Sequence, residues 1–223
     1  MKRKVLVVAA IVAVISILSV GTLAWYSDSQ EKVNKFIVSS DGEGQPDFSV
    51  DLIESVNDEV SDVVPTVIYD DDQNPTGLKY DAILPGDYLS KEPKAVNTGA
   101  YDEYIKITVT LVGDAEQWAE MVPGFQLTSC LKGVDPDIFV FDNISDDGMT
   151  VVYYYNKILA PGATSEPVFL GFEFPDEATV ENSPVSFDLK VKADAVQTRN
   201  IVDPDDYATV ALAAKAAFTV LGA

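Results

Sequence analysis

The sequence contains no histidine and only one cysteine among its 223 residues. These absences exclude the imidazole bases, histidine zinc ligands and cysteine clusters on which many hydrolases and metalloenzymes depend. An internal disulfide is excluded as well, so a folded domain must be held together by packing. We interpret Cys130 as a small core residue; the alternative, an intermolecular disulfide, requires that it be exposed.

Positive charge is also scarce. Lys and Arg total 15 against 36 Asp and Glu, which gives a formal net charge of −21 at pH 7. Such a field repels phosphate backbones, and we predict no nucleic-acid partner. Hydrophobic residues nevertheless make up 47% of the chain, which is enough to build the core of a globular protein.

The N-terminus has the organisation of a signal peptide. Met1–Lys4 carries three positive charges, Val5–Val20 is an unbroken apolar run, and Gly21–Ala24 supplies small residues. We predict export with cleavage between Ala24 and Trp25. Loss of these 24 residues would leave 199 and, because three cations leave with them, would change the formal charge from −21 to −24. The alternative is an uncleaved membrane anchor, since about 20 apolar residues span a bilayer.

Alternation with a period of two predicts several strands. Residues 104–111 have apolar side chains at every odd position, which places those side chains on one face of a half-buried strand. The pattern recurs in Phe187–Ala195 and Phe48–Leu52, and an Asp-Gly step predicts a hairpin between Ile138–Phe141 and Val151–Tyr155. Further short strands are predicted at Lys35–Ser39, Thr66–Tyr69, Lys94–Asn97, Phe125–Cys130 and Val168–Phe174.

Many short strands without alternating helices predict a mainly β protein, an antiparallel β-sandwich of jelly-roll type. Two helices are expected, one that Asp114 caps and one that begins at Asp203-Pro204. The second either packs on its own sandwich or binds a partner. We therefore divide the chain into a signal peptide (1–24), an N-terminal segment and linker (25–46), a β-sandwich domain (47–202) and a C-terminal helix (203–223).

Several motifs together resemble one group of exported proteins. The junction Gly21–Ser29 resembles the processing site of a SipW-type signal peptidase. The stretches that resemble the TasA/camelysin-like family of secreted and surface proteins are Ile83–Asp87, Lys91–Pro93, Val96–Lys106, Tyr154–Lys157, Leu159–Gly162 and Ala193–Gln197. The resemblance implies a jelly-roll subunit of biofilm matrix fibres. It also implies three partners: copies of the same chain, the signal peptidase during export, and other matrix proteins.

In such fibres, the resemblance implies, the segment after the cleavage site is a donor strand that completes the next subunit. Trp25–Ser39 fits this role because it starts with an aromatic pair and ends in a β-prone stretch with Phe36 and Val38 on one face. The loose composition of Asp41–Asp47 would let the segment leave its own sandwich. The alternative is an ordinary first strand. The donor-strand residues that we predict are Trp25, Tyr26, Phe36, Ile37 and Val38.

Catalytic chemistry finds little support in the sequence. Some camelysin-like proteins have been classed as metalloendopeptidases, but this chain could offer zinc only carboxylates, a poor match to its usual ligands. Ser90 and Lys91 are neighbours in a predicted strand, where their side chains would point to opposite faces. We predict that the protein is not an enzyme and has no catalytic residues.

Calcium is the one metal that the composition leaves open. Asp70, Asp72 and Asn74 place oxygens as an EF-hand loop does, but Pro75 replaces the required glycine. We predict no resident cofactor, with a looser calcium site there, or among Asp142, Asp146 and Asp147, as the alternative. Two functions remain: a self-assembling subunit of an extracellular matrix or cell surface, or a monomeric secreted or membrane-anchored module that binds another surface partner.

Overall fold

The computed structural model describes residues 49–57, 59–69, 71, 75–179, 187–199 and 201–222. Within them the protein is mainly β, as predicted, and the strands pair in antiparallel fashion. The predicted signal peptide and the predicted donor strand Trp25–Ser39 lie outside the described residues, as do the calcium candidates Asp70, Asp72 and Asn74.

The described chain contains eleven strands, with two short helices between β6 and β7 and two helical segments after β11. The strands are β1 (Val50–Ser55), β2 (Thr66–Tyr69), β3 (Pro75–Lys79), β4 (Tyr88–Ser90), β5 (Glu92–Asn97), β6 (Glu103–Val112), β7 (Leu131–Lys132), β8 (Phe139–Ile144), β9 (Thr150–Tyr155), β10 (Gly171–Glu173) and β11 (Asp188–Gln197). The helices are α2 (Ala115–Met121), α3 (Leu127–Cys130), the 3-10 helix η1 (Pro204–Asp206) and α4 (Val210–Leu221).

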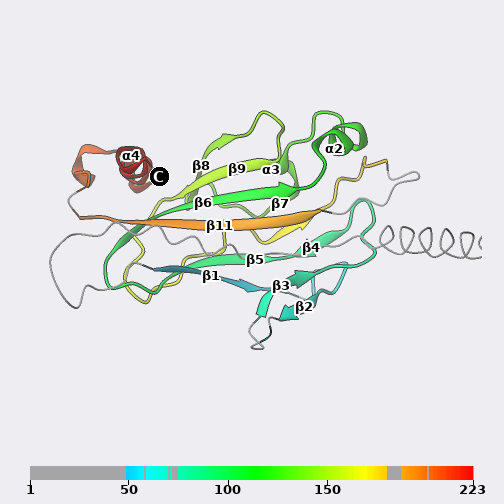
Figure 1. The fold of residues 1–223 in the computed structure, drawn as a ribbon, viewed down its shortest axis with the longest axis horizontal. Coiled ribbons are helices and arrows are strands. Elements are labelled where there is room, and N and C mark those ends of the chain that lie inside the picture. Colours follow the sequence, from blue (N-terminus) through cyan, green and yellow to red (C-terminus); the bar gives the residue numbers. More distant parts are fainter. Residues whose placement is uncertain are drawn as a thin grey trace, which may run out of the picture.

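The longest strands form a four-stranded sheet in the order β11-β6-β9-β8 (Figure 1). β6 and β11 have 10 residues each and pair along their whole length. In β6, Ile105, Ile107 and Val109 are fully buried while the residues between them are largely half-buried. The period-two patterns therefore predicted both strands correctly, because one face of this sheet covers the core.

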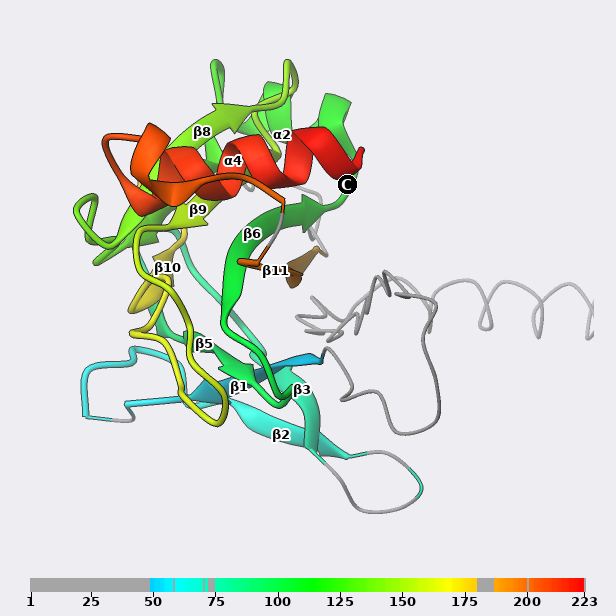
Figure 2. The same cartoon turned by 90° about the vertical axis from the view of Figure 1, so that its left-hand side faces the viewer.

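A second layer lies against the inner face of this sheet (Figure 2). It contains the pair β1-β5 and the short sheet β4-β10-β7, while β2 and β3 form a separate hairpin beyond β1. The two layers make the β-sandwich that the sequence predicts. β2 and β5 match the predicted strands Thr66–Tyr69 and Lys94–Asn97 closely, whereas β10 covers only the middle of Val168–Phe174.

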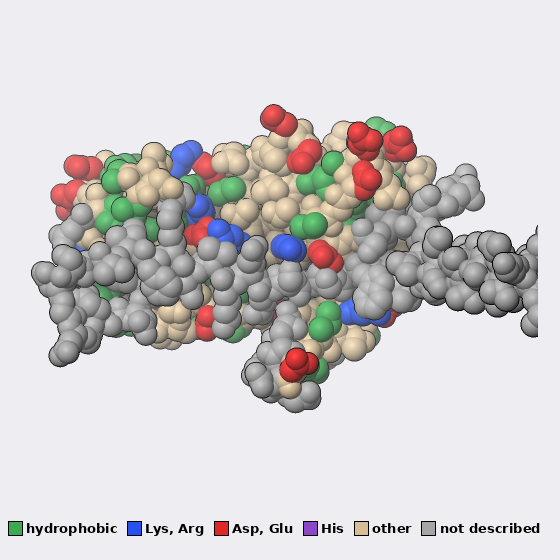
Figure 3. Space-filling view, in the orientation of Figure 1, with side chains coloured by type: hydrophobic (Ala, Val, Ile, Leu, Met, Phe, Trp, Pro, Cys, Tyr) green, Lys and Arg blue, Asp and Glu red, His purple; other side chains and the backbone are tan. Residues whose placement is uncertain are grey.

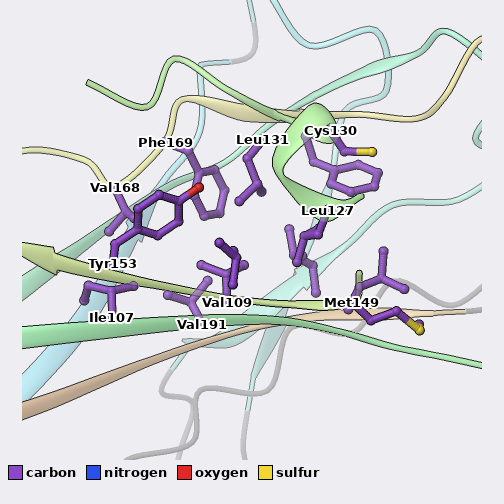
Figure 4. Packing of buried hydrophobic residues seen from close by; sticks show 14 of the residues in the cluster. Ile107, Val109, Leu127, Cys130, Leu131, Met149, Tyr153, Val168, Phe169 and Val191 are labelled. Carbon is purple, nitrogen blue, oxygen red and sulfur yellow. The ribbon is translucent and has the colours of Figure 1, made fainter. Parts of the chain in front are cut away.

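The core fills the space between the layers (Figure 4). Side chains of β6, β9 and β11 meet side chains from α3, β7 and the segment before β10; among them are Val109, Tyr153, Val191, Leu127 and Phe169. Cys130 belongs to this cluster and is 2% exposed. The interpretation of Cys130 as a core residue is confirmed.

The predicted hairpin is formed by β8 and β9. Its turn places Gly148 at φ +74°, in the left-handed region, and a Cβ atom there would lie 2.2 Å from the carbonyl oxygen of Phe125. The carboxylate of Asp147 accepts hydrogen bonds from the Ser145 hydroxyl and the Met149 amide. The Asp-Gly step is therefore needed both for conformation and for space.

One strand prediction was wrong. Instead of a strand, Phe125–Cys130 contains the short helix α3, whose end leads directly into β7. Leu127, Cys130 and Leu131 are buried while Ser129 is exposed, so the apolar residues follow a helical spacing of three and four. This helical spacing distinguishes the segment from the strands, whose apolar residues alternate with a period of two.

The C-terminal helix starts later than predicted. Asp203 caps only the 3-10 helix η1, and α4 begins at Val210 with Thr209 as its N-cap. α4 lies on the outer face of the four-stranded sheet (Figure 1). Its small residues and Phe218 pack there against Tyr104 and Tyr154.

Candidate functional site: the outer edge of strand β11

The four-stranded sheet ends in two outer strands whose edges differ. On β8 the pairing shifts register between Phe141 and Asn143, and Asp142 forms an ion pair with Lys215 of α4. Bulges and charged side chains of this kind protect an edge against further strand pairing. β11 keeps a regular register over all its residues, and among the described residues it pairs with β6 alone. Among the described residues, the edge of β11 therefore lacks the register shift that interrupts β8, and no further strand pairs with it, although it too carries charged side chains.

This edge lies beside β1 of the second layer (Figure 2). β1 pairs with β5, and within the described part of the chain no ladder joins β1 to β11. The two layers meet here without continuous backbone pairing. A strand laid along this boundary would meet the backbone groups of Leu189–Gln197 and an inner face that carries Leu189, Val191 and Ala193.

The basic side chains that form no ion pair with any described residue lie on β11 or directly after it. Most described lysines have a carboxylate partner: Lys79, Lys91, Lys94, Lys106, Lys132, Lys157, Lys192 and Lys215. Of the cations that the structure describes, only Lys190 on β11 and Arg199 just after it form no ion pair. In Figure 3 basic side chains appear in the middle of the face with acidic side chains beside them, and further acidic side chains lie toward its upper corners.

A pocket of about 600 Å³ opens at the end of β11. Its apolar walls include Ile158, Ile201 and Val202, and Arg199 and Asp203 bring one charge of each sign. The pocket can hold an apolar side chain flanked by charged groups.

A buried acid lies at the same end of the sandwich. Glu103, the first residue of β6, is 0% exposed, and neither carboxyl oxygen makes a regular hydrogen bond to any described residue. Burial raises its pKa to about 8, and the backbone of Ser49 offsets only part of this rise. The group is therefore largely neutral at pH 7. The sequence could have indicated that Glu103 is buried, because it continues the inward-facing series of Ile105 and Ile107.

The loop before Glu103 is fixed by Asn97. Its side-chain amide donates to the carbonyl oxygens of Tyr101 and Leu159 at 2.7 and 2.8 Å, and its Oδ1 accepts from the Gly99 amide at 2.9 Å. Asn97 is 0% exposed. These bonds give Asn97 an architectural role, because its short side chain satisfies backbone groups of the loop.

The other candidate groups have structural partners. Ser90 Oγ accepts a hydrogen bond from the Asn57 amide, whereas Lys91 Nζ bonds to Glu54, so the two side chains serve different contacts. Of the alternative calcium ligands, Asp142 pairs with Lys215, and Asp147 is bonded within its own turn. Among the residues that the structure describes, no three acidic or cysteine side chains cluster closely enough to hold a metal ion.

No family model, curated protein or solved structure matches this chain. In the described part of the chain, none of the helices has the length and hydropathy required to cross a membrane.

Proposed function

We propose that this chain is an exported structural subunit that assembles with copies of itself into extracellular fibres of the biofilm matrix type. The observation that carries the proposal is the edge of β11, which is long and regular and has no described partner beyond β6. Soluble proteins usually cover or interrupt such an edge because it invites pairing with another chain. At the opposite edge of the same sheet, β8 is interrupted by a register shift and carries the ion pair of Asp142 with Lys215.

The donor in this proposal is Trp25–Ser39 of a neighbouring copy. Its backbone would pair with β11, and Phe36 and Val38 would cover apolar side chains at the boundary with β1. Burial of this apolar area contributes several kcal/mol at about 25 cal/mol per Å². Because donor and acceptor are different surfaces, the contact repeats head to tail and does not close, which produces a filament.

The protein acts in this proposal through assembly and not through catalysis. The neighbouring Ser90 and Lys91 serve separate structural contacts, with Asn57 and with Glu54. Glu103 and Asn97 are 0% exposed, so their side chains do not face the solvent. We propose neither enzymatic activity nor a resident cofactor, and a location outside the cell.

Electron microscopy of the mature chain, residues 25–223, tests this function. We expect filaments from the mature chain and a folded monomer from a variant that lacks Trp25–Ser39. Circular dichroism of both proteins controls for folding. A mature chain that stays monomeric at all salt concentrations would instead support the surface-binding module. Intact mass of the secreted protein tests export, because an anchor would retain Met1–Ala24.

A further inference from the structure

We propose that residues 31–39 of a neighbouring copy pair in parallel with β11, with Glu31 opposite Lys190 and Lys35 opposite Asp194. This inference rests on the proposed function. It goes further because it fixes the direction and the register of the incoming strand.

The outer face of β11 sets the charge pattern that a partner must match. Lys190, Lys192 and Asp194 alternate with the buried residues of β11 and so share this face. Asp194 Oδ1 lies 3.0 Å from Lys192 Nζ, and its Oδ2 lies 3.5 Å from Lys106 Nζ. Lys190 forms no ion pair with any described residue. A partner strand should therefore bring an acid to Lys190.

The spacing of the charged residues on β11 determines whether a parallel or an antiparallel partner strand matches them. Lys190 and Asp194 are four residues apart, so a parallel partner needs an acid followed four residues later by a lysine. An antiparallel partner needs the reverse order. Between Trp25 and Phe48, Glu31 and Lys35 have the parallel order, as do Asp28 and Lys32, and no acid there follows a lysine by four residues. Opposite charges on neighbouring strands stabilise pairing and like charges oppose it. The charges therefore favour the parallel direction.

The apolar residues select between the two parallel registers. With Glu31 opposite Lys190, Phe36 and Val38 lie opposite Ala195 and Gln197, on the face of β11 that covers the core. With Asp28 opposite Lys190, Phe36 and Val38 would turn to the outer face.

Charge reversal tests this register in the mature chain. We expect Lys190→Glu and Glu31→Lys each to raise the critical concentration for assembly about three- to tenfold, and the double variant to restore it. Glu31→Lys makes the protein less acidic, so if only net charge mattered it would assemble more readily. Lys132→Glu is the matched control, because it changes the charge equally on β7, where Lys132 pairs with Glu173 at 3.1 Å.

Oxidative cross-linking gives a second, independent measurement. The variant Glu31→Cys/Lys190→Cys should form a ladder of disulfide-linked oligomers, whereas Asp28→Cys/Lys190→Cys should form far less, because a disulfide requires closely placed Cβ atoms. Cys130 does not interfere, since it is 2% exposed.

The outcomes separate the two proposals. Rescue in the double charge variant together with the Glu31 ladder supports the register. Filaments that need Trp25–Ser39 but show no rescue, or that favour the Asp28 ladder, overturn the register and leave strand addition intact. A mature chain that never assembles overturns both.

Discussion

The Nζ atom of Lys91 lies 2.5 Å from Oε1 of Glu54, and the two side chains are only 4% and 8% exposed. This ion pair joins β1 to the residue between β4 and β5. A charge in such a place depends on its partner, because removal of one member leaves the other ionised and poorly solvated.

We expect Lys91→Met to lower the free energy of unfolding by about 3–5 kcal/mol at pH 7. The double variant Lys91→Met/Glu54→Leu should recover most of this loss, since it removes both charges of this pair. Lys132→Met is the control: its pair with Glu173 is about 40% exposed on both sides and contributes at most about 1 kcal/mol. Urea denaturation measures all three. A double variant less stable than Lys91→Met would contradict this account.

Glu103 makes the stability of the fold depend on pH. Its pKa is raised from 4.5 to about 8 in the folded protein, so between these values the folded chain keeps a proton that the unfolded chain has lost. Stability therefore falls as pH rises through this window, by up to about 1.4 kcal/mol per pH unit from this group. We expect Glu103→Gln to remove that part of the slope and to stabilise the protein most near pH 8. Denaturation curves from pH 5 to pH 8.5, with the surface variant Glu173→Gln as control, measure the effect. Parallel curves for Glu103→Gln and wild type would refute it.

Cys130 should be inert in the native protein. Burial raises the pKa of its thiol to about 11, and thiolate is the form that reacts. We expect no labelling by a maleimide at pH 7.5 in the folded state and complete labelling in urea. Rapid native labelling, or a dimer that reducing agent dissolves, would favour the intermolecular disulfide instead.

Assembly should accelerate as charge repulsion is screened. Residues 25–223, the chain expected after cleavage, carry a formal charge of −24, so copies should repel one another at long range. Added salt or a lower pH should shorten the lag before light scattering rises, while ion pairs in direct contact are screened less. A lag that did not change with ionic strength would show that repulsion does not limit association.

Local patterns predicted most of the longer strands and the β8-β9 hairpin, but not the pairing of strands that lie far apart in the chain. The alternation in residues 104–111 was sufficient to identify β6, and the Asp-Gly step identified the turn between β8 and β9. The pairing of β11 with β6, some 80 residues apart in the chain, follows from tertiary packing that no local pattern contains. That Lys190 and Arg199 form no ion pair with any described residue could not be predicted from local patterns either, because ion pairs such as Lys106–Asp194 depend on the pairing of β6 with β11.

Hydrogen exchange of the β11 amides tests the central claim most directly. The mature chain, assembled into filaments, is compared with the folded variant that lacks Trp25–Ser39, and exchange is followed by peptide-resolved mass spectrometry. An incoming strand must bond to the outward backbone groups of Leu189–Gln197, so we predict strong protection of this peptide in filaments alone. The edge of β8 should exchange equally in both samples. Unchanged exchange in β11, with new protection at β8 or elsewhere, would show that β11 is not the acceptor edge.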